Sequence, residues 1–127
     1  MAIEYKFDII PATEVIIDLY KSSGINRSTT DKERIRKMYA NSNFIVTAWD
    51  KDRLVGIARS LTDFCHCCYL SDLAVRKEYQ KQGIGKKLIR LTKDKIDEVT
   101  MLLLLSAPTS MDLSSNGLNK TILFSYN

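Results

Sequence analysis

The sequence has few of the residues that interrupt or cross-link a chain. It contains 5 glycines, 2 prolines and 3 cysteines among 127 residues, and no stretch rich in Pro, Gly or Ser separates one part from another. We therefore predict a single domain over residues 1–127. A chain of this length can bury most of its unfolded surface but is too short for two ordinary cores.

Long hydrophobic runs are also absent. The most apolar stretch, residues 99–105, is far too short to cross a bilayer. Residues 1–6 lack the basic, apolar and small-residue order of a signal peptide. We expect a cytoplasmic protein that does not act at a membrane.

Cysteine and histidine are too few and too close together for a structural zinc site. Cys65, Cys67 and Cys68 flank the lone His66 in one short stretch, whereas structural zinc needs a second, distant pair of ligands. The adjacent Cys67 and Cys68 would also point to opposite faces of a strand. We predict no metal, and three buried or half-buried cysteines at a strand start in a reducing compartment.

Positive charge is present but local. The formal net charge of +4 comes mostly from residues 76–95, and such a cluster suits an anionic ligand. Attraction to nucleic-acid phosphates does not depend on sequence. However, no aromatic-studded basic strand or recognition-helix pattern accompanies these lysines, so we predict no nucleic-acid partner.

The first third of the chain predicts a strand and two helices. Alternating apolar residues around Tyr5 and ending at Ile9 indicate a half-buried strand that Pro11 terminates. Helical spacing from Val15 to Tyr20 stops at Gly24, a residue typical of helix C-caps. Thr30 and Glu33 have the spacing of a capping box. They predict a second helix that carries Ile35, Met38 and Tyr39.

The remainder predicts strands around one amphipathic helix. Residues 44–49 and 54–61 are joined by a short charged turn, which favours an antiparallel hairpin. Residues 67–75 form a third strand. The helix that follows carries an apolar stripe of Ile84, Leu88 and Leu91, widened by Ile89 and Ile96. Residues 99–106 indicate a strand buried on both faces, and residues 121–126 provide one more.

A basic turn with two glycines joins the strand at residues 70–75 to this helix. Gly83 and Gly85 would let a bulky anion approach unpaired N–H groups where the helix dipole favours negative charge. The turn is not a Walker motif, because Lys87 stands where Ser or Thr should be, and the dinucleotide fingerprint lacks its third glycine. Taken alone, the pattern also fits an ordinary tight turn beside a solvated lysine face.

A resemblance favours the anion-binding interpretation. Gln80-x-x-Gly83-x-Gly85, preceded by Leu73-Ala74-Val75, resembles the acetyl-coenzyme A signature of the GNAT superfamily of N-acetyltransferases, Arg/Gln-x-x-Gly-x-Gly/Ala. Residues 43–75 resemble a bacterial subgroup of small, largely uncharacterised GNAT proteins. The resemblance extends from about residue 7 to 108. It implies an α/β fold (α+β by some schemes) with a mixed, mostly antiparallel sheet flanked by helices.

The resemblance also implies an order of elements and a set of ligand-binding residues. The order is strand, two helices, three strands, helix and strand, followed by an atypical tail at residues 109–127. In this fold the signature strand splays away from its neighbour and admits the pantetheine arm of acetyl-coenzyme A. The residues that match the binding positions are Leu73, Ala74, Val75, Gln80, Lys81, Gln82, Gly83, Ile84, Gly85 and Lys86.

The resemblance further implies direct acetyl transfer to an amine of a small molecule or protein. Asp72 is the candidate base, because it is a carboxylate within an otherwise apolar strand and burial there would raise its pKa. The alternative is that Asp72 orients its neighbours, with Arg59 or Tyr69 as structural partners. The resemblance implies acetyl-coenzyme A as the co-substrate.

The tail departs from the family pattern. The tyrosine that often reprotonates the thiolate is missing, since Leu113 or Ser114 stands in its place. An alternative function is therefore a catalytically impaired acetyl-coenzyme A-binding or regulatory relative. A shortened sheet would also leave the strand at residues 99–106 with an open edge, which favours a homodimer through the C-terminal strands.

Overall fold

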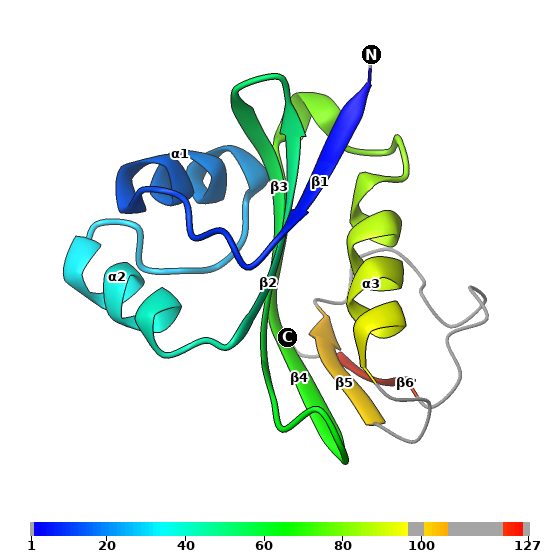
Figure 1. Ribbon diagram of the computed structural model, residues 1–127. Helices are drawn as coiled ribbons and strands as arrows, with labels where there is room; N and C mark the ends of the chain where they lie inside the picture. The colour runs from blue at the N-terminus through cyan, green and yellow to red at the C-terminus, as the bar shows by residue number, and fades with distance from the viewer. Residues whose placement is uncertain (1, 97–100, 107–120, 126–127) are drawn as a thin grey trace.

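A mixed sheet with helices on both faces forms the molecule. The computed structural model describes residues 2–96, 101–106 and 121–125. These residues form a six-stranded sheet in the order β1-β2-β3-β4-β5-β6. Each pair of neighbouring strands from β1 to β4 is antiparallel. β5 is parallel to both of its neighbours, β4 and β6. Figure 1 shows α1 and α2 on one face and α3 on the other.

The order of elements is the predicted one. In chain order they are β1 (Ile3–Phe7), α1 (Thr13–Ser23), α2 (Lys32–Ala40), β2 (Phe44–Asp50), β3 (Arg53–Thr62), β4 (Cys67–Val75), the short 3₁₀ helix η1 (Lys77–Tyr79), α3 (Ile84–Lys95), β5 (Met101–Ser106) and β6 (Thr121–Ser125). In the part of the chain that the structure describes, no helix combines the length and apolarity needed to span a membrane.

Apart from one-residue extensions of β2 and β3, local features differ from the predictions at two places. The first strand ends before Ile9, which is 47% exposed, because Asp8 adopts a left-handed φ of 57°. The capping box at Thr30 is wrong by one residue. Asp31 caps α2 by accepting a hydrogen bond from the Arg34 backbone N–H at 3.0 Å. The C-cap at Gly24 is confirmed, with a left-handed φ of 83°.

The expected open edge at the strand of residues 99–106 is wrong. β5 lies between two strands, since it pairs in parallel with β4 on one side and with β6 on the other. The tail therefore contributes a strand that covers the edge for which we predicted a partner copy.

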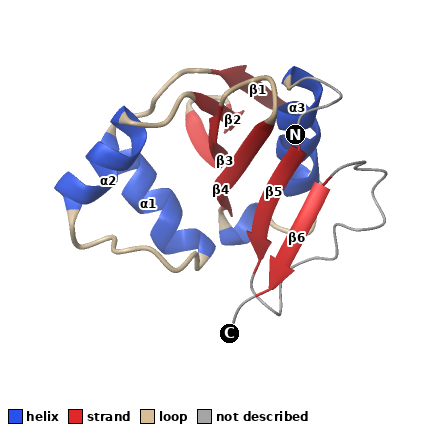
Figure 2. Cartoon of the chain, turned by 90° about the horizontal axis from the view of Figure 1, so that it is seen from below, coloured by secondary structure: helices blue, strands red, loops and turns tan. Residues whose placement is uncertain are grey.

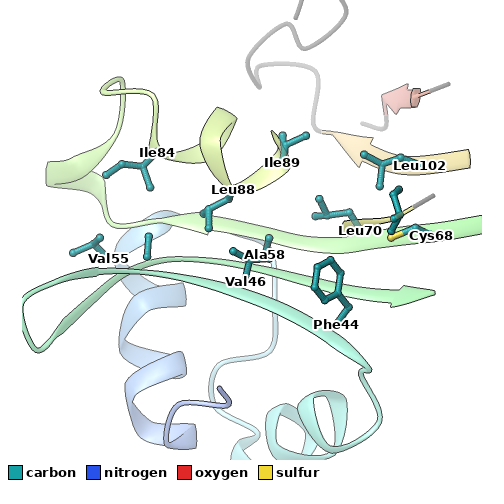
Figure 3. Packing of buried hydrophobic residues seen from close by; sticks show 12 residues of the cluster. Phe44, Val46, Val55, Ala58, Cys68, Leu70, Ile84, Leu88, Ile89 and Leu102 are labelled. Carbon is teal, nitrogen blue, oxygen red and sulfur yellow. The ribbon is translucent and has the colours of Figure 1, made fainter. Parts of the chain in front are cut away.

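Two apolar clusters hold the helices on the sheet. The α3 cluster places Ile84, Leu88 and Ile89 of α3 against the sheet, as Figure 3 shows. The α1–α2 cluster packs both other helices against the opposite face, from residues such as Leu19 and Ile35. Leu88 and Leu19 are fully buried, and each such side chain contributes about 1.5–3 kcal/mol to stability. The helix at the glycine turn is thus fixed by its own apolar stripe.

A β-bulge in β4 changes which face its side chains occupy. Ser71 stands between Leu70 and Asp72 without a partner of its own in β3. A bulge bends the strand and reverses the alternation of the residues that follow. Leu70, before the bulge, packs in the α3 cluster, whereas Ala74, after it, packs in the α1–α2 cluster. Asp72 therefore lies on the face of α1, opposite to Leu70.

Candidate functional site

Strands β4 and β5 part before either of them ends. Leu70 and Leu104 are the last residues that they pair, although β4 continues to Val75 and β5 to Ser106. Figure 2 shows the two arrows diverging toward their tips. Beyond Leu70, β4 still pairs with β3 on its other side. Its second edge has no strand partner among the described residues, so an extended ligand with amide groups could pair there as an added strand.

The glycine turn lies just beyond this unpartnered edge. Gly83 is the N-cap of α3, with a φ of 88°, and it has no side chain to cap the helix. The first turn of α3 contains no acidic residue. The N–H groups at the start of a helix lack partners within the helix and carry its positive dipole end. A Cβ added at Gly83 would meet no atom within 4 Å, so the protein leaves this position open for a bulky anion.

Hydrogen bonds fix the turn to the rest of the molecule. The Gln80 side chain donates to the Val75 carbonyl at 2.8 Å and to the Ser23 carbonyl at 3.3 Å. Arg76 is buried, donates to the Leu54 carbonyl at 2.6 Å, and pairs with Asp18 at 2.8 Å. The turn is therefore held by the ends of β4 and α1. The exposed Gln80 therefore helps to hold the shape of the turn.

The remaining predicted ligand residues lie around the same end of β4. Lys81 has a left-handed φ of 64°, and the Gln82 side chain donates to the Glu78 carbonyl at 3.4 Å. Lys86 is exposed on the first turn of α3, whereas Gly85 is buried beneath it. The two predicted segments, residues 73–75 and 80–86, thus lie together where β4 ends and α3 begins.

Asp72 lies at the centre of a buried polar network. Its side chain has no exposed surface. The Tyr20 hydroxyl donates to Oδ2 at 2.5 Å. Oδ1 accepts from Arg59 at 3.0 Å and from the Ser71 hydroxyl at 3.0 Å. Arg27 donates to the same oxygen through Nε at 3.1 Å and a terminal nitrogen at 2.7 Å. The Tyr39 hydroxyl extends the network through a 2.5 Å contact with that of Tyr20.

The network lowers the pKa of Asp72, contrary to the prediction. Burial acts to raise this pKa, but hydrogen bonds from Arg59, Arg27 and Tyr20 outweigh it and lower the value to about 2. A raised pKa is therefore wrong. Both oxygens of this acidic carboxylate already accept hydrogen bonds, so Asp72 is poorly suited to take up a proton from an amine. Burial, together with the charges of Tyr39 and Asp72, raises the pKa of Tyr20, so its hydroxyl stays protonated as a donor.

The partners of Asp72 were only partly predictable. Arg59, proposed from the sequence as a structural partner, is confirmed, whereas Tyr69 makes no hydrogen bond to Asp72 in the described structure. Arg27 was missed because it lies in an irregular connection without a motif. Tyr20 and Tyr39 were assigned to the core by their helical spacing. Their hydroxyls, which need partners when buried, were the signal that could have pointed to a polar network.

The cysteine stretch forms the tip of the β3–β4 hairpin. Cys68 is buried as expected, but Cys65 and Cys67 are exposed, so that part of the prediction is wrong. The reason is that Asp63 accepts backbone hydrogen bonds from residues 65, 66 and 67 and curls the chain into an exposed turn. Within residues 2–96, 101–106 and 121–125, no three His, Cys, Asp or Glu side chains lie close enough to hold a metal ion.

The predicted loss of the C-terminal tyrosine concerns Leu113 and Ser114, which lie outside the described residues. The missing acid therefore remains a prediction from the sequence.

Comparisons with known proteins agree with this geometry. The acetyltransferase (GNAT) family matches residues 13–108. A probable acetyltransferase of unknown function from meticillin-resistant Staphylococcus aureus is 24% identical, covering 99% of this chain and 80% of that chain, with a TM-score of 0.71. A GNAT-family acetyltransferase from Streptococcus pneumoniae is 25% identical, covering 91% and 80%, with a TM-score of 0.69.

A third solved structure contains a ligand. The PaiA N-acetyltransferase of Thermoplasma acidophilum, in complex with coenzyme A, is 21% identical. The match covers 74% of this chain and 71% of that chain, with a TM-score of 0.55. The comparison with curated proteins found no match.

Proposed function

Because the chain belongs to the GNAT acetyltransferase family, we propose that it transfers the acetyl group of acetyl-coenzyme A to a primary amine of a small molecule or protein. The observation that carries this proposal is the parting of β4 and β5 directly beside an open helix N-terminus. A solved relative of the same fold is a complex with coenzyme A.

Two sets of main-chain groups would hold the acetyl donor. Leu73, Ala74 and Val75 lie on the free edge of β4, where the amide groups of the pantetheine arm can pair with the strand. The N–H groups of residues 84–86 open α3 and would take the diphosphate. Lys81 and Lys86 add positive charge beside them. The side chains of Gln80 and Gln82 also hold the shape of the turn.

The chemistry that this arrangement supports is direct transfer. The neutral amine nitrogen attacks the thioester carbonyl, a C–N bond forms, and the C–S bond breaks to release coenzyme A as a thiolate. The proton that the nitrogen loses passes to water. Backbone N–H groups near Leu73 could stabilise the negative charge that develops on the carbonyl oxygen. A thiolate is a competent leaving group without a dedicated acid because thiol pKa values are modest. Most of the rate would come from holding the two reactants together.

Titration calorimetry tests the binding step. We expect the wild-type protein to bind acetyl-coenzyme A, and Gly83→Ala to bind it at least tenfold more weakly. The added Cβ meets no protein atom, so it would occupy space that the diphosphate needs. The left-handed φ of 88° also costs an alanine roughly 1 kcal/mol of stability.

Gly24→Ala is the matched control for backbone strain. Gly24 has a φ of 83°, and a Cβ there also meets no atom within 4 Å. Both variants should therefore lose similar stability, while only Gly83→Ala loses affinity. Equal affinity of Gly83→Ala and wild type would refute the placement of the diphosphate. A thiol-release assay with defined amines then tests transfer; binding without release from any of them would favour the impaired relative.

A further inference from the structure

We propose that Tyr79 is a positioning residue for the acetyl donor. Its hydroxyl fixes η1 to the turn between β2 and β3, residues 50–53, and η1 leads directly into the glycine turn, residues 80–83. This inference rests on the proposed acetyl transfer, because it concerns the coenzyme A side of the same site.

Packing fixes the two elements on either side of the predicted diphosphate site. β4 pairs with β3 as far as Val75, which lies opposite Gly56. The first turns of α3 lie so close to the same glycine that a Cβ added there would be 3.1 Å from Leu88 and 3.2 Å from Ile84. Residues 76–83 connect these two elements. Contacts with other parts of the chain must hold this connection in place.

The connection is held to the end of α1 on one side. The Lys77 backbone N–H donates to the Ser22 hydroxyl at 3.0 Å, and the Gln80 side chain donates to the Ser23 carbonyl at 3.3 Å. Both hydrogen bonds are exposed, so water competes for the same groups and their net contribution is modest.

Tyr79 holds the other side of the connection to the β2–β3 turn. Its hydroxyl donates to Asp50 Oδ2 at 2.6 Å in a partly buried hydrogen bond, and its ring packs against the α3 cluster. Arg53 lies over this ring, 5.6 Å from its centroid, and pairs with Glu78 at 2.6 Å. Figure 1 shows the β2–β3 turn and the segment that leads into α3 at the same end of the sheet.

The Tyr79 hydroxyl makes the strongest of these links. Hydrogen bonds to an ionised acceptor are stronger than neutral ones. The side chains of Arg53 and Glu78 are 50% and 51% exposed, and such exposed ion pairs contribute little. The hydrogen bond to Asp50 also raises the pKa of Tyr79, so its hydroxyl stays protonated as a donor.

The glycine turn needs this support because its backbone is strained. Lys81 has a left-handed φ of 64° without being a glycine, and such a residue keeps this conformation only where the surrounding structure enforces it. The Gln82 side chain donates to the Glu78 carbonyl at 3.4 Å, which folds the turn back onto η1. When η1 is released from Asp50, fewer molecules hold the turn in the shape that takes the diphosphate. The apparent dissociation constant rises in inverse proportion to that fraction.

The test compares Tyr79→Phe with wild type by titration calorimetry with acetyl-coenzyme A. We expect the dissociation constant to rise at least fivefold, while backbone hydrogen exchange accelerates at residues 80–86 and stays unchanged in α2. The ring remains in the α3 cluster, so the variant should fold. At saturating acetyl-coenzyme A, its kcat should stay within twofold for the amine that is acetylated fastest among lysine, tyramine, spermidine and kanamycin.

Variants of Asp50 test the same link from its other end. Asp50→Asn keeps an oxygen that accepts from Tyr79, so it should bind acetyl-coenzyme A no more than twofold more weakly than wild type. Asp50→Leu removes the acceptor and should match Tyr79→Phe. Because both single variants break one hydrogen bond, the double variant should bind no more weakly than either of them.

Tyr5→Phe is the matched control. Tyr5 is also half-buried against the α3 cluster, but its hydroxyl makes no hydrogen bond within the described residues. Its loss should leave the dissociation constant unchanged. Unchanged binding by Tyr79→Phe, or an equal loss of affinity in Tyr5→Phe, would overturn the role of Tyr79.

Failure of the proposed function has a different signature. If the wild-type protein binds no acetyl-coenzyme A, this inference falls with the proposed function. If it binds acetyl-coenzyme A but acetylates none of the four amines, the proposed transfer to these amines fails, and the dissociation constants of the variants still decide the role of Tyr79.

Discussion

Replacing Asp72 by asparagine separates two roles for the buried carboxylate. As an anchor, it holds Arg27 and Arg59 by charge and hydrogen bonds. As a base, it would accept a proton from the acceptor amine. Asparagine keeps the size of the side chain and one acceptor oxygen but removes the negative charge, so both roles are impaired, with different consequences for stability and for rate.

The structure gives the size of the stability loss. A pKa lowered from 3.8 to about 2 corresponds to about 2 kcal/mol of preferential interaction with the charged form. Removing one partner of a buried ion pair typically costs about 3–5 kcal/mol, since the opposite charge is left uncompensated. We expect the variant to lose about 3 kcal/mol, which lowers the unfolding temperature of a domain of this size by roughly 10 °C.

Thermal unfolding and steady-state kinetics on the same samples provide the measurement. The anchor role predicts a large loss of stability and a kcat whose dependence on pH keeps its inflection. Glu33→Gln is the control, because Glu33 also pairs with an arginine, Arg36, but the two side chains are 61% and 55% exposed. Exposed pairs contribute about 0–1 kcal/mol, so this variant should unfold close to wild type.

A catalytic role for Asp72 predicts the opposite combination of results. If Asp72→Asn unfolds at the wild-type temperature while kcat falls 100-fold or more and the acidic limb of its pH profile disappears, Asp72 is the base. General acid–base catalysis contributes about 10²–10⁴-fold to rate, so such a loss would be unmistakable.

Two further predictions concern the same network. Tyr20→Phe removes a donor to Asp72 and should lower the free energy of unfolding by about 1–3 kcal/mol. Tyr39→Phe should lower it less, because the Tyr39 hydroxyl contacts that of Tyr20 and not the carboxylate itself. Equal unfolding temperatures of the two variants would contradict this order. Because the folded-state pKa of Asp72 lies below its unfolded value, its stabilisation is complete above about pH 4 and is lost as pH falls toward about 2. Wild type should therefore lose about 2 kcal/mol more than Asp72→Asn across this range, and parallel acid-unfolding curves would argue against it.

The helix pattern was predictable where one face of the helix packs against a single layer. The helix stripe from Ile84 to Leu88 matches the structure because burial imposes a period of 3.6 on the sequence. Capping is harder to predict, since Thr30 and Asp31 are both good caps and in the structure it is Asp31 that accepts from the Arg34 N–H.

The polar part of the site could not be predicted in the same way. Leu70, Asp72 and Ala74 are every second residue in the sequence. Because of the bulge at Ser71, Leu70 lies on the α3 face, whereas Asp72 and Ala74 lie on the α1 face. Arg27 is 45 residues away from Asp72 along the chain, in a segment without periodicity. Such contacts depend on how three layers assemble, and a pattern within one element carries no information about them.

The extra residue in β4 supports the buried carboxylate without setting its direction. Deleting Ser71 would let the ladder to β3 run on without interruption, and Leu70 and Asp72 would still point to opposite faces. The same deletion would remove the hydroxyl that donates to Asp72 and the carbonyl that accepts from Arg27. A regular β4 would therefore keep the aspartate beneath α1 but surround it with fewer partners.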